Sequence, residues 1–338
     1  MVRIPHTLDW IEHVTPAMAG NALQLLFDFY ASRALKRPII KGMPASISFE
    51  PTTSCNLRCP ECPSGLRSFS RPTGNLDLQL FDSTLNQLEK ELSYLTLYFQ
   101  GEPFLHQGIY EIIANARDRG IYVATSTNAH YLNEENCEKI IRSGLNKLIV
   151  SIDGATQETY EQYRVGGKLE SVLEGTKELI RLKKHFSQGS PEIVFQFLVV
   201  KQNEHEIGQI KKMANEMGVD QVVFKTAQVY DYEKGSPFIP ENEKYSRYTK
   251  KEEGYKIKNK LYNHCWRMWQ GSVITWDGKV VPCCFDKDGE HVLGDLKEQS
   301  FRDIWFGEKY NAFRKTLLTN RKSIDICRNC TEGTRVWI

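Results

Sequence analysis

The sequence predicts an α/β fold built on a parallel sheet, and three observations support that prediction. From residue 45 onward, short runs rich in β-branched and aromatic residues alternate with stretches of helical periodicity. Apolar residues make up 41% of the 338 positions, which is enough for a sizeable buried core. No run of about 18 apolar residues occurs in the sequence, so a membrane-spanning helix is not expected.

The first 44 residues are predicted to be helical. Apolar side chains recur at roughly helical spacing over Leu8–Leu35, and Pro38 ends the stretch. Two interpretations stay open: a cap packed on the main domain, or a helix that docks on a partner or a membrane surface. Arg33, Lys36 and Arg37 follow the apolar stretch, an order that favours peripheral membrane contact within the second interpretation.

The alternating core is expected to span residues 45–226. Its strands are predicted at Ala45–Phe49, Leu95–Phe99, Ile121–Ser126, Lys147–Ile152, Ile193–Val200 and Gln221–Phe224. Its helices are predicted at Leu78–Leu92, Ile109–Arg119, Asn133–Ser143, Leu169–His185 and Glu204–Met217. Strands separated by helices pair in parallel through right-handed crossovers. The alternation alone leaves an open doubly wound sheet and a partial (β/α) barrel as alternatives, and both collect their chemistry at the C-terminal ends of the strands.

Residues 227–262 break the alternation and are predicted to form a linker, because Lys, Glu, Tyr, Gly and Pro dominate them. The final segment, residues 263–338, opens with a hairpin signal, since Ser272–Trp276 and Lys279–Pro282 flank Asp277-Gly278. Two short helices are expected after this hairpin, near Ser300–Trp305 and Glu308–Leu318.

Charge and cysteine content narrow the class of protein. Lys and Arg total 44 against 42 for Asp and Glu, a balance that argues against a dedicated nucleic-acid binder. The N-terminus lacks a signal-peptide pattern, so a cytoplasmic location is expected. Nine cysteines cannot all pair with one another, and in a reducing compartment clustered thiols more often hold metal than form disulfides.

Three cysteines directly follow the first predicted strand. Cys55, Cys59 and Cys62 lie in the run Cys-Asn-Leu-Arg-Cys-Pro-Glu-Cys. Three thiolates on one tight loop suit an iron–sulfur cluster that keeps one iron open to an outside ligand. A zinc site completed by a distant fourth ligand is the alternative.

This loop and the turns after it resemble the radical S-adenosylmethionine (radical SAM) superfamily. The spacing Cys-x3-Cys-x2-Cys matches the family's cluster loop, and Gln100-Gly101-Glu102-Pro103 resembles its Gly-Gly-Glu-Pro segment, with Gln100 in place of a glycine. The resemblance implies a partial (β/α)6 TIM-like barrel, a 4Fe–4S cluster on the three cysteines, and SAM bound to its open iron.

The resemblance also implies which residues hold SAM. Gly101, Glu102 and Pro103 would receive the methionine ammonium, which needs acceptors such as a carboxylate or backbone carbonyls. Further matches follow later strands, and they assign SAM contacts to Asn128 in Ser-Thr-Asn-Ala, Ser151 and Asp153 in Ser-Ile-Asp-Gly, and Arg164 in Tyr-Arg-Val-Gly-Gly. Glu61 departs from the family, many of whose members carry an aromatic residue there against the adenine.

A second set of cysteines lies in the final segment. Its spacing, with Gly278 five residues before Cys283, resembles the SPASM extension or its shorter "twitch" form, which binds auxiliary clusters. The resemblance implies one auxiliary 4Fe–4S cluster on Cys265, Cys283, Cys327 and Cys330. Cys284 could replace Cys283, and a structural zinc knuckle is the alternative to iron. Cys137, within a predicted helix, is expected to be a small buried hydrophobe.

Several further side chains are candidates for the substrate site. Tyr98, Gln196 and Lys225 lie in or just after predicted strands, where a polar side chain can bind substrate or satisfy an internal hydrogen bond. Asp286 could accept a substrate proton, and a turn or capping role is the alternative. The large aromatic residues of the final segment are expected to pack around the auxiliary cluster and exclude water, namely Trp266, Trp269, Trp276, Trp305 and Phe306.

The resemblance implies radical chemistry supplied by the cofactors, with the protein orienting the reactants. Reductive cleavage of SAM gives a 5′-deoxyadenosyl radical that takes hydrogen from the substrate, and an auxiliary cluster with four cysteine ligands is suited to take the remaining electron. A net dehydrogenation of an alcohol, a sugar-like small molecule or a peptide residue is therefore expected, with flavodoxin or ferredoxin as electron donor.

Alternatives to dehydrogenation stay open. An epimerase would return hydrogen from a thiol, with Cys284 as the first donor to consider, and a peptide-modifying maturase would act on a precursor peptide. Residues 1–44 look short for a leader-peptide domain, which favours a small or carrier-linked substrate. A non-catalytic iron–sulfur or zinc protein is the alternative from another class.

Overall fold

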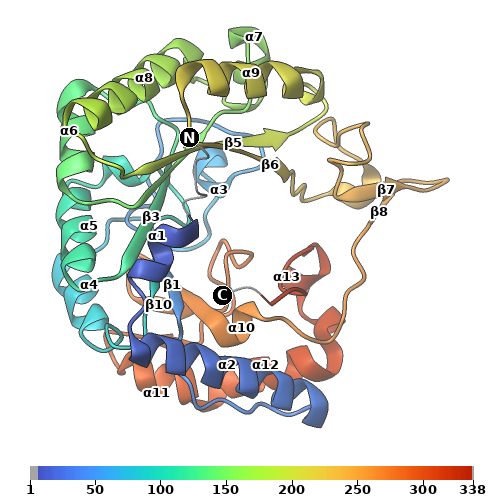
Figure 1. Cartoon of the computed structure of the whole chain (residues 1–338). Coiled ribbons are helices and arrows are strands. Elements are labelled where there is room, and N and C mark those ends of the chain that lie inside the picture. The colour runs from blue at the N-terminus through green and yellow to red at the C-terminus, as the bar shows by residue number, and fades with distance from the viewer. Residues whose placement is uncertain (1–6, 337–338) are drawn as a thin grey trace.

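The computed structural model describes residues 7–336, and one large sheet forms its core (Figure 1). Within these residues the sheet has nine strands in the order β11-β10-β9-β1-β2-β3-β4-β5-β6. The strands of the alternating core pair in parallel from one to the next, at β1 Ser46–Phe49, β2 Tyr94–Thr96, β3 Tyr122–Thr127, β4 Lys147–Ser151, β5 Glu192–Val199 and β6 Gln221–Thr226. The predicted α/β class with a parallel core is thus confirmed.

Helices cover the outer face of this curved sheet in an arc (Figure 1). They are α4 Leu78–Leu85, α5 Ile109–Asp118, α6 Glu134–Arg142, α7 Gln157–Tyr163, α8 Leu169–His185 and α9 Ile207–Met217. In α8 the residues Val172, Thr176, Leu179 and Ile180 are buried, which is the one-sided pattern of a helix packed on a sheet. The helix begins and ends where the periodicity predicts.

Two predictions within the core need correction. The second strand ends at Thr96, so Tyr98 and Phe99 lie in the loop after it rather than within the strand. The helix predicted over Leu78–Leu92 ends at Leu85, and a series of turns follows. In these turns Leu88 and Leu92 are still buried, because backbone bonds from Leu88 to Leu85 and from Leu92 to Leu88 keep the apolar side chains facing the core.

The final segment continues the sheet instead of forming a sheet of its own. The predicted hairpin is present as β9 Gly271–Ile274 and β10 Lys279–Val281, and β11 Gly294–Asp295 pairs with β10. Strand β9 pairs in parallel with β1, from Ser46 opposite Gly271 to Phe49 opposite Ile274. A side chain added at Gly271 would lie 1.9 Å from the Ser46 carbonyl oxygen, so only glycine allows this approach.

Short elements complete the chain. The predicted linker holds a small hairpin, with η3 Tyr232–Lys234, β7 Tyr248–Lys250 and β8 Tyr255–Ile257. The loops after β1, β2 and β5 hold α3 Pro63–Leu66, η1 Pro103–Leu105 and η2 Glu204–Glu206. The final segment adds α10 Arg267–Gln270, α11 Phe301–Phe306, α12 Glu308–Asn320, η4 Arg321–Ser323 and α13 Asp325–Arg328.

The N-terminal helical stretch is two helices rather than one. Helix α1 spans Thr7–Glu12 and α2 spans Pro16–Leu35. The break between them arises because Thr15 caps α2 by accepting a bond from the Met18 backbone N–H, with Pro16 as the first helical residue. No helix among residues 7–336 is long and apolar enough to cross a membrane.

The aromatic residues expected around the auxiliary cluster also contact earlier parts of the chain. Trp266 and Trp269 pack edge-on against Phe29 of α2, and the Trp269 indole donates to the Ile39 carbonyl. Trp305 donates to the Gly42 carbonyl. Trp276 contacts the loop after the first cysteines, where its indole donates to the Pro72 carbonyl. Trp269 and Trp305 belong to the same buried cluster as Cys265 and Cys327, and the indoles of Trp269, Trp276 and Trp305 also join the final segment to earlier parts of the chain.

Candidate active site and cluster-binding loops

The three cysteines after β1 lie on a tight loop that ends in α3. The Cys62 N–H donates to the Cys59 carbonyl at 3.3 Å, and the Leu66 N–H donates to the Cys62 carbonyl at 2.8 Å. A side chain at Gly65 would lie 2.5 Å from both the backbone N and the carbonyl O of Cys59. Glycine at this position is therefore what lets the loop fold back on itself.

The thiols of this loop suit a metal cluster. All nine cysteines are free, and burial raises the pKa of Cys55 and raises that of Cys59 to about 11. Such thiols stay protonated in water and release their protons when a metal binds to the sulfur. Among the described residues, no three His, Cys, Asp or Glu side chains converge as ligands of one metal ion. The three thiols of this loop are soft sulfur donors, and such donors fit an iron–sulfur cluster rather than a single ion with mixed ligands.

The loop after β2 is held against the cysteine loop by backbone contacts. The Glu102 N–H donates to the Ser54 carbonyl at 2.7 Å, and the Gly101 N–H donates to the Ser64 hydroxyl at 2.8 Å. Gly101 has φ +75°, and a Cβ there would lie 2.2 Å from the Thr52 carbonyl oxygen. The Gly-Glu-Pro segment predicted for SAM thus lies directly beside the cysteines.

The Glu102 carboxylate points into the core rather than standing free. One oxygen accepts from the Thr127 hydroxyl at 2.8 Å, and the other accepts from the Asn128 N–H at 2.7 Å. Burial raises the pKa of Glu102 to about 7, against these hydrogen bonds, which lower it. Pro103 is buried and begins the turn η1, whose N-terminus the same carboxylate caps. Glu102 therefore fixes the ends of β2 and β3 relative to each other.

The turns after β3 and β4 lie beside this segment. The Asn128 side-chain amide donates to the Asn56 side-chain oxygen at 2.7 Å and lies 4.0 Å from the Cys55 sulfur. Ser151 is buried, and its hydroxyl lies 3.3 Å from that of Ser126 on the neighbouring strand. The structure thus brings Asn128 to the cysteine loop and places Ser151 one strand further along.

Asp153 and Arg164 form the charged part of the site. Asp153 is fully buried; one carboxylate oxygen accepts from the Leu198 N–H at 2.7 Å and the other from the Arg164 Nε at 2.5 Å. The Arg164 Nη1 lies 3.9 Å from the Cys59 sulfur. Both Asp153 oxygens are thus occupied, and the ion pair directs the guanidinium toward the sulfur, where it can offset negative charge.

Four cysteines gather in the final segment around a buried arginine. Cys265, Cys327 and Cys330 are buried and Cys283 is half-buried. Burial, together with the charge of Cys265, raises the pKa of Cys330 to about 11. The fully buried Arg321 donates to the Cys330 sulfur at 3.5 Å and to the His264 carbonyl at 2.8 Å. These groups fit a second iron–sulfur cluster, because the cation offsets the charge of thiolates.

Cys284 differs from its neighbour in both exposure and surroundings. Its side chain is exposed, whereas Cys283 acts electrostatically on Cys265 and Cys330. The charged groups acting on Cys284 are Arg267, Glu332 and Lys287. Cys284 thus acts on Cys283, but the charged groups that act on Cys284 itself differ from those around the four-cysteine set.

Replacing each member of this cysteine pair in turn separates ligand from non-ligand. Cys283→Ala is expected to lose the iron and sulfide of one cluster, because it removes one of four thiolates. Cys284→Ala is expected to keep full iron content. Iron and sulfide analysis of the two variants, purified without oxygen, checks this. Loss of iron from Cys284→Ala alone would reverse the assignment.

Tyr98 lies near Cys284, and Lys225 lies near Glu332. Burial raises the pKa of Tyr98 to about 12, and Cys284 is the charged neighbour with the largest effect. Lys225 is exposed and acts on Glu332, which forms an ion pair with Arg267. Gln196 is half-buried on β5 opposite Ser151. The first two predicted candidates are therefore neighbours of one polar group that also contains Arg267 and Glu332.

The remaining candidates hold loops together. Both Asp286 oxygens accept backbone bonds, one from the Glu290 N–H at 2.8 Å and one from the His291 N–H at 2.9 Å. These bonds favour the turn role of this buried carboxylate. Glu61 accepts from the Tyr230 N–H at 3.2 Å. Cys137 is fully buried, as expected of a small hydrophobe, with its sulfur 3.8 Å from the Gly175 carbonyl.

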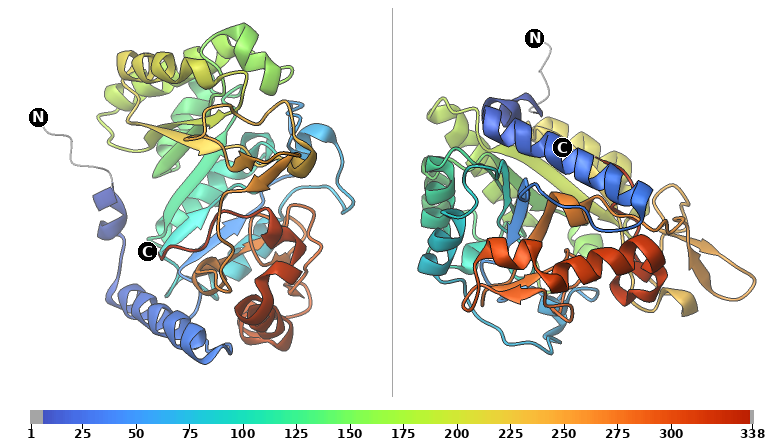
Figure 2. Two further views of the ribbon diagram at one scale, coloured as in Figure 1. Left: turned by 90° about the vertical axis from the view of Figure 1, so that its right-hand side faces the viewer. Right: turned by 90° about the horizontal axis from the view of Figure 1, so that it is seen from below.

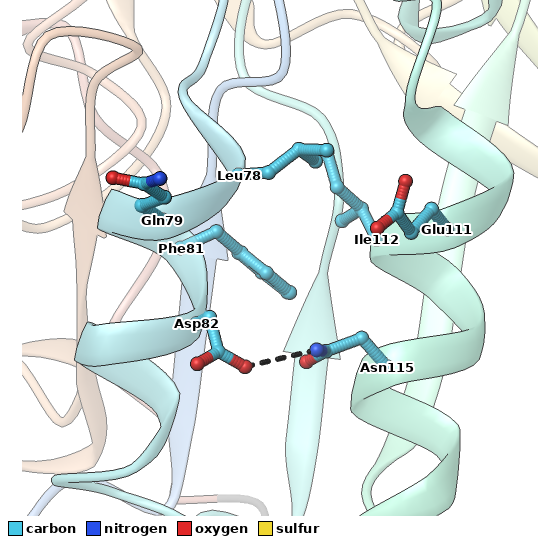
Figure 3. A pocket seen from close by; sticks show the side chains of 7 residues that line it. All are labelled: Leu78, Gln79, Phe81, Asp82, Glu111, Ile112 and Asn115. Carbon is cyan, nitrogen blue, oxygen red and sulfur yellow. Dashed lines mark hydrogen bonds between the residues drawn. The ribbon is translucent and has the colours of Figure 1, made fainter.

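Two pockets differ in their relation to the cysteines. One of about 290 Å³ lies between the first cysteine loop and the final segment, lined by residues that include Pro63, Tyr230 and Lys287. The other, of about 350 Å³, lies between α4 and α5 on the outer helical layer (Figure 3). There Asp82 accepts from Asn115 and Arg119, so the polar groups are paired within the protein. None of the predicted site residues lines this outer pocket.

Sequence reasoning missed several supporting residues. Ser64, Thr127 and Asn56 hold the SAM segment and Asn128, and they adjoin motif residues in the sequence, so proximity was an available signal. Arg267, which is half-buried, and Arg321, which is fully buried, had no such signal. The sequence alone does not show whether an arginine is buried or exposed.

Two family matches cover most of the chain. Residues 49–214 match the family described as the radical SAM superfamily. Residues 265–331 match SPASM, described as an iron–sulfur cluster-binding domain. The first match implies a 4Fe–4S cluster with SAM, and the second implies iron–sulfur binding by the second cysteine set.

Curated relatives are similar along most of their length. An AdoMet-dependent heme synthase from Methanosarcina barkeri is 28% identical over 308 residues, 80% of this chain and 84% of that protein. A PqqA peptide cyclase from Gluconobacter oxydans is 24% identical over 320 residues, 87% and 84% of the two chains. An S-adenosyl-L-methionine-dependent 2-deoxy-scyllo-inosamine dehydrogenase from Niallia circulans is 24% identical over 295 residues. The match covers 84% of this chain and 91% of that protein.

Solved structures share the fold. SuiB from Streptococcus suis, bound to S-adenosylmethionine, aligns with a TM-score of 0.64 at 14% identity, covering 90% of this chain and 75% of SuiB. BtrN in complex with AdoMet and 2-DOIA aligns with a TM-score of 0.55 at 20% identity, covering 87% of this chain and 95% of BtrN. The partial barrel implied by the sequence resemblance is thereby confirmed. The chain belongs to the radical SAM superfamily, among the members that carry a C-terminal SPASM domain.

Proposed function

We propose that this radical SAM enzyme dehydrogenates its substrate. The observation that supports the proposal best is the second cysteine set, in which Cys265, Cys283, Cys327 and Cys330 act on one another electrostatically around Arg321. Four thiolates leave a cubane cluster no open iron, which suits electron transfer rather than substrate coordination. Similarity to a dehydrogenase that uses SAM supports the same reaction.

The cofactors supply the one-electron chemistry and the protein holds them. When bound, the first cluster with SAM supplies a 5′-deoxyadenosyl radical that takes a hydrogen atom, and the second supplies an acceptor for the electron left on the substrate. Cys55, Cys59 and Cys62 would hold the first cluster. Arg164, fixed by Asp153 beside Cys59, is placed to pair with a carboxylate, and Asn128 would offer its amide.

Dehydrogenation also releases a proton, which a residue near Cys284 would receive. A Tyr98 with a pKa raised to about 12 by burial stays protonated at neutral pH and suits hydrogen-bond donation. Asp286 is engaged by two backbone N–H groups. Burial opposes the ionisation of Glu332, but Arg267 lowers the pKa of this carboxyl, so Glu332 is ionised and its carboxylate can take up a proton. We therefore propose the Glu332 carboxylate as the proton acceptor, with the cations Lys225 and Arg267 beside it.

The relatives suggest a class of substrate, and we propose no individual compound. Relatives carry names that describe a small-molecule dehydrogenase and a peptide cyclase. We propose an alcohol or sugar-like small molecule, with a peptide residue as the second choice. Flavodoxin or ferredoxin is proposed as the source of the priming electron.

A variant of the second cysteine set tests the proposal. Cys327→Ala is expected to keep SAM cleavage, because its site is separate from Arg164 and the first cysteine loop. It is expected to lose nearly all oxidised product, because the electron acceptor is gone. Measurement of 5′-deoxyadenosine and product after reduction with dithionite checks both. Full product yield from this variant would refute the electron-accepting role, and absence of 5′-deoxyadenosine from the wild-type protein would favour a non-catalytic cluster protein.

Epimerisation is a second candidate, favoured by the exposed thiol of Cys284 among polar groups. A thiol there could return a hydrogen atom to the substrate from the opposite face. Reaction in deuterium oxide distinguishes the two outcomes. Deuterium at an inverted carbon, lost in Cys284→Ala, would replace dehydrogenation, whereas a ketone formed equally by this variant would support it.

A further inference from the structure

The first two helices carry an unusual concentration of exposed apolar side chains. Ten large apolar side chains of the described residues stay exposed, and half of them lie here, namely Ile11, Leu23, Phe27, Tyr30 and Leu35. Leu23 and Phe27 are 67% and 63% exposed, the highest values of the ten. An apolar group of this kind on one face marks an interaction surface rather than the usual scatter of single residues.

Three of these side chains, those of Leu23, Phe27 and Tyr30, form one face of α2, which we call the outer face. Leu23, Phe27 and Tyr30 follow the spacing i, i+4, i+7, and the exposed small residues Ala19 and Gly20 extend the face toward its start. The helix spans 20 residues, which corresponds to a length of about 30 Å. Figure 2 shows α2 at the periphery of the molecule, along one edge of the final segment.

The opposite face of α2 is firmly attached, so the outer face is not exposed through loose packing. Leu25 and Phe29 are fully buried, and Phe29 packs edge-on against Trp266 and Trp269. The fully buried Asp28 accepts from the Lys41 N–H at 2.6 Å and the Gly42 N–H at 3.0 Å. This arrangement holds the outer face outward in a fixed orientation.

The exposed charges of the α2 segment, residues 15–38, have one sign. Asp28 is the only acidic residue between Thr15 and Pro38, and it is buried. Exposed cations follow the apolar side chains at Arg33, Lys36 and Arg37. Along the sequence, the nearest exposed carboxylate is that of Glu12, before the start of α2. A partner of this surface must therefore accept apolar side chains and carry negative charge beside them.

An anionic lipid surface meets both requirements. The outer face is a single convex helix, which a protein partner could cover only with a matching groove, whereas lipid adapts to any convex shape. The order of apolar side chains flanked by cations is that of helices lying in a membrane interface. We propose that α2 lies in the headgroup region of an anionic membrane, with Leu23 and Phe27 toward the acyl chains and Arg33, Lys36 and Arg37 on the headgroups.

Vesicle sedimentation tests this inference without reference to catalysis. The probes are vesicles of phosphatidylcholine alone and of equimolar phosphatidylcholine and phosphatidylglycerol. The wild-type protein is expected to sediment with the anionic vesicles only. Leu23→Gln/Phe27→Gln is expected to stay in the supernatant, and Arg33→Gln/Arg37→Gln is expected to bind at least about tenfold more weakly, since each cation contributes to attraction by the anionic surface. Salt is expected to weaken binding.

A matched control removes two exposed cations elsewhere. Lys184→Gln/Lys212→Gln on α8 and α9 changes the net charge equally and is expected to bind as the wild type does. Circular dichroism shows whether each variant is folded. Equal binding by the outer-face variant and wild type would overturn the inference, as would failure of the wild type to bind anionic vesicles. A dimer in solution that Leu23→Gln/Phe27→Gln dissociates would assign the face to a second copy instead.

Discussion

Gly101→Ala is expected to unfold the Gly101-Glu102-Pro103 segment, for which the sequence predicts SAM contacts. The position has φ +75°, which strains any residue with a side chain, and the new Cβ would lie 2.2 Å from the Thr52 carbonyl oxygen. The strain and the clash together are expected to lower the free energy of unfolding by roughly 3–5 kcal/mol. Because Gly101 and Glu102 bond to Ser64 and Ser54 of the cysteine loop, formation of 5′-deoxyadenosine is expected to fall below detection.

Gly120→Ala is the matched control for this substitution. Its φ is +76°, yet a Cβ there meets no atom within 4 Å. The expected cost is only the conformational strain, about 1 kcal/mol, with SAM cleavage preserved. Urea unfolding of both variants followed by product analysis gives the comparison. Similar losses in the two variants would show that backbone conformation, not close approach to Thr52, explains the glycine.

Arg164→Met is expected to have the second large effect. It would leave the fully buried Asp153 without its cation, with only the Leu198 N–H on its carboxylate. Removing one partner of a buried ion pair costs about 3 kcal/mol. If the guanidinium also pairs with the SAM carboxylate, the rate of SAM cleavage is expected to drop about a hundredfold, a loss typical of a charged hydrogen bond.

The double variant Asp153→Asn/Arg164→Met separates the two roles of Arg164. Neutralising Asp153 is expected to recover about 1–2 kcal/mol of the lost stability, because no buried charge is then left unpaired. SAM cleavage is expected to stay low, since the guanidinium is still missing. Calorimetry and binding of SAM to the reconstituted protein give both quantities. Recovery of SAM binding in the double variant would mean that Arg164 acts only on folding.

The sequence alone predicted the elements whose side chains face one common surface. Helix α8 and strand β5 match their predictions closely, because the apolar period in each reports the face packed on the core. The second strand was placed too late because Tyr98 and Phe99 extend an apolar run beyond Thr96. Side-chain type alone does not show where pairing ends, since that depends on the register of the neighbouring strands.

The candidate site was predictable where chemistry requires particular residue types. The cysteines are recognisable because few other residues bind iron. Glu102 and Arg164 are recognisable because few other residues pair with the charged ammonium and carboxylate groups of SAM. The partners that orient them were not, because Leu198 and Ser54 contribute backbone groups that every residue carries. The inward direction of the Glu102 carboxylate likewise depends on where β3 lies, which is a property of the folded sheet.

The pairing of β9 with β1 has a consequence for how the protein is made. Strand β1 is synthesised well before residues 271–274, which pair with one of its two edges. Until then that edge exposes unpaired backbone groups next to the cysteine loop, a state open to mispairing with another chain. Synthesis of residues 271–274 therefore completes this edge of the sheet, and we expect the first cluster to be inserted after these residues have emerged.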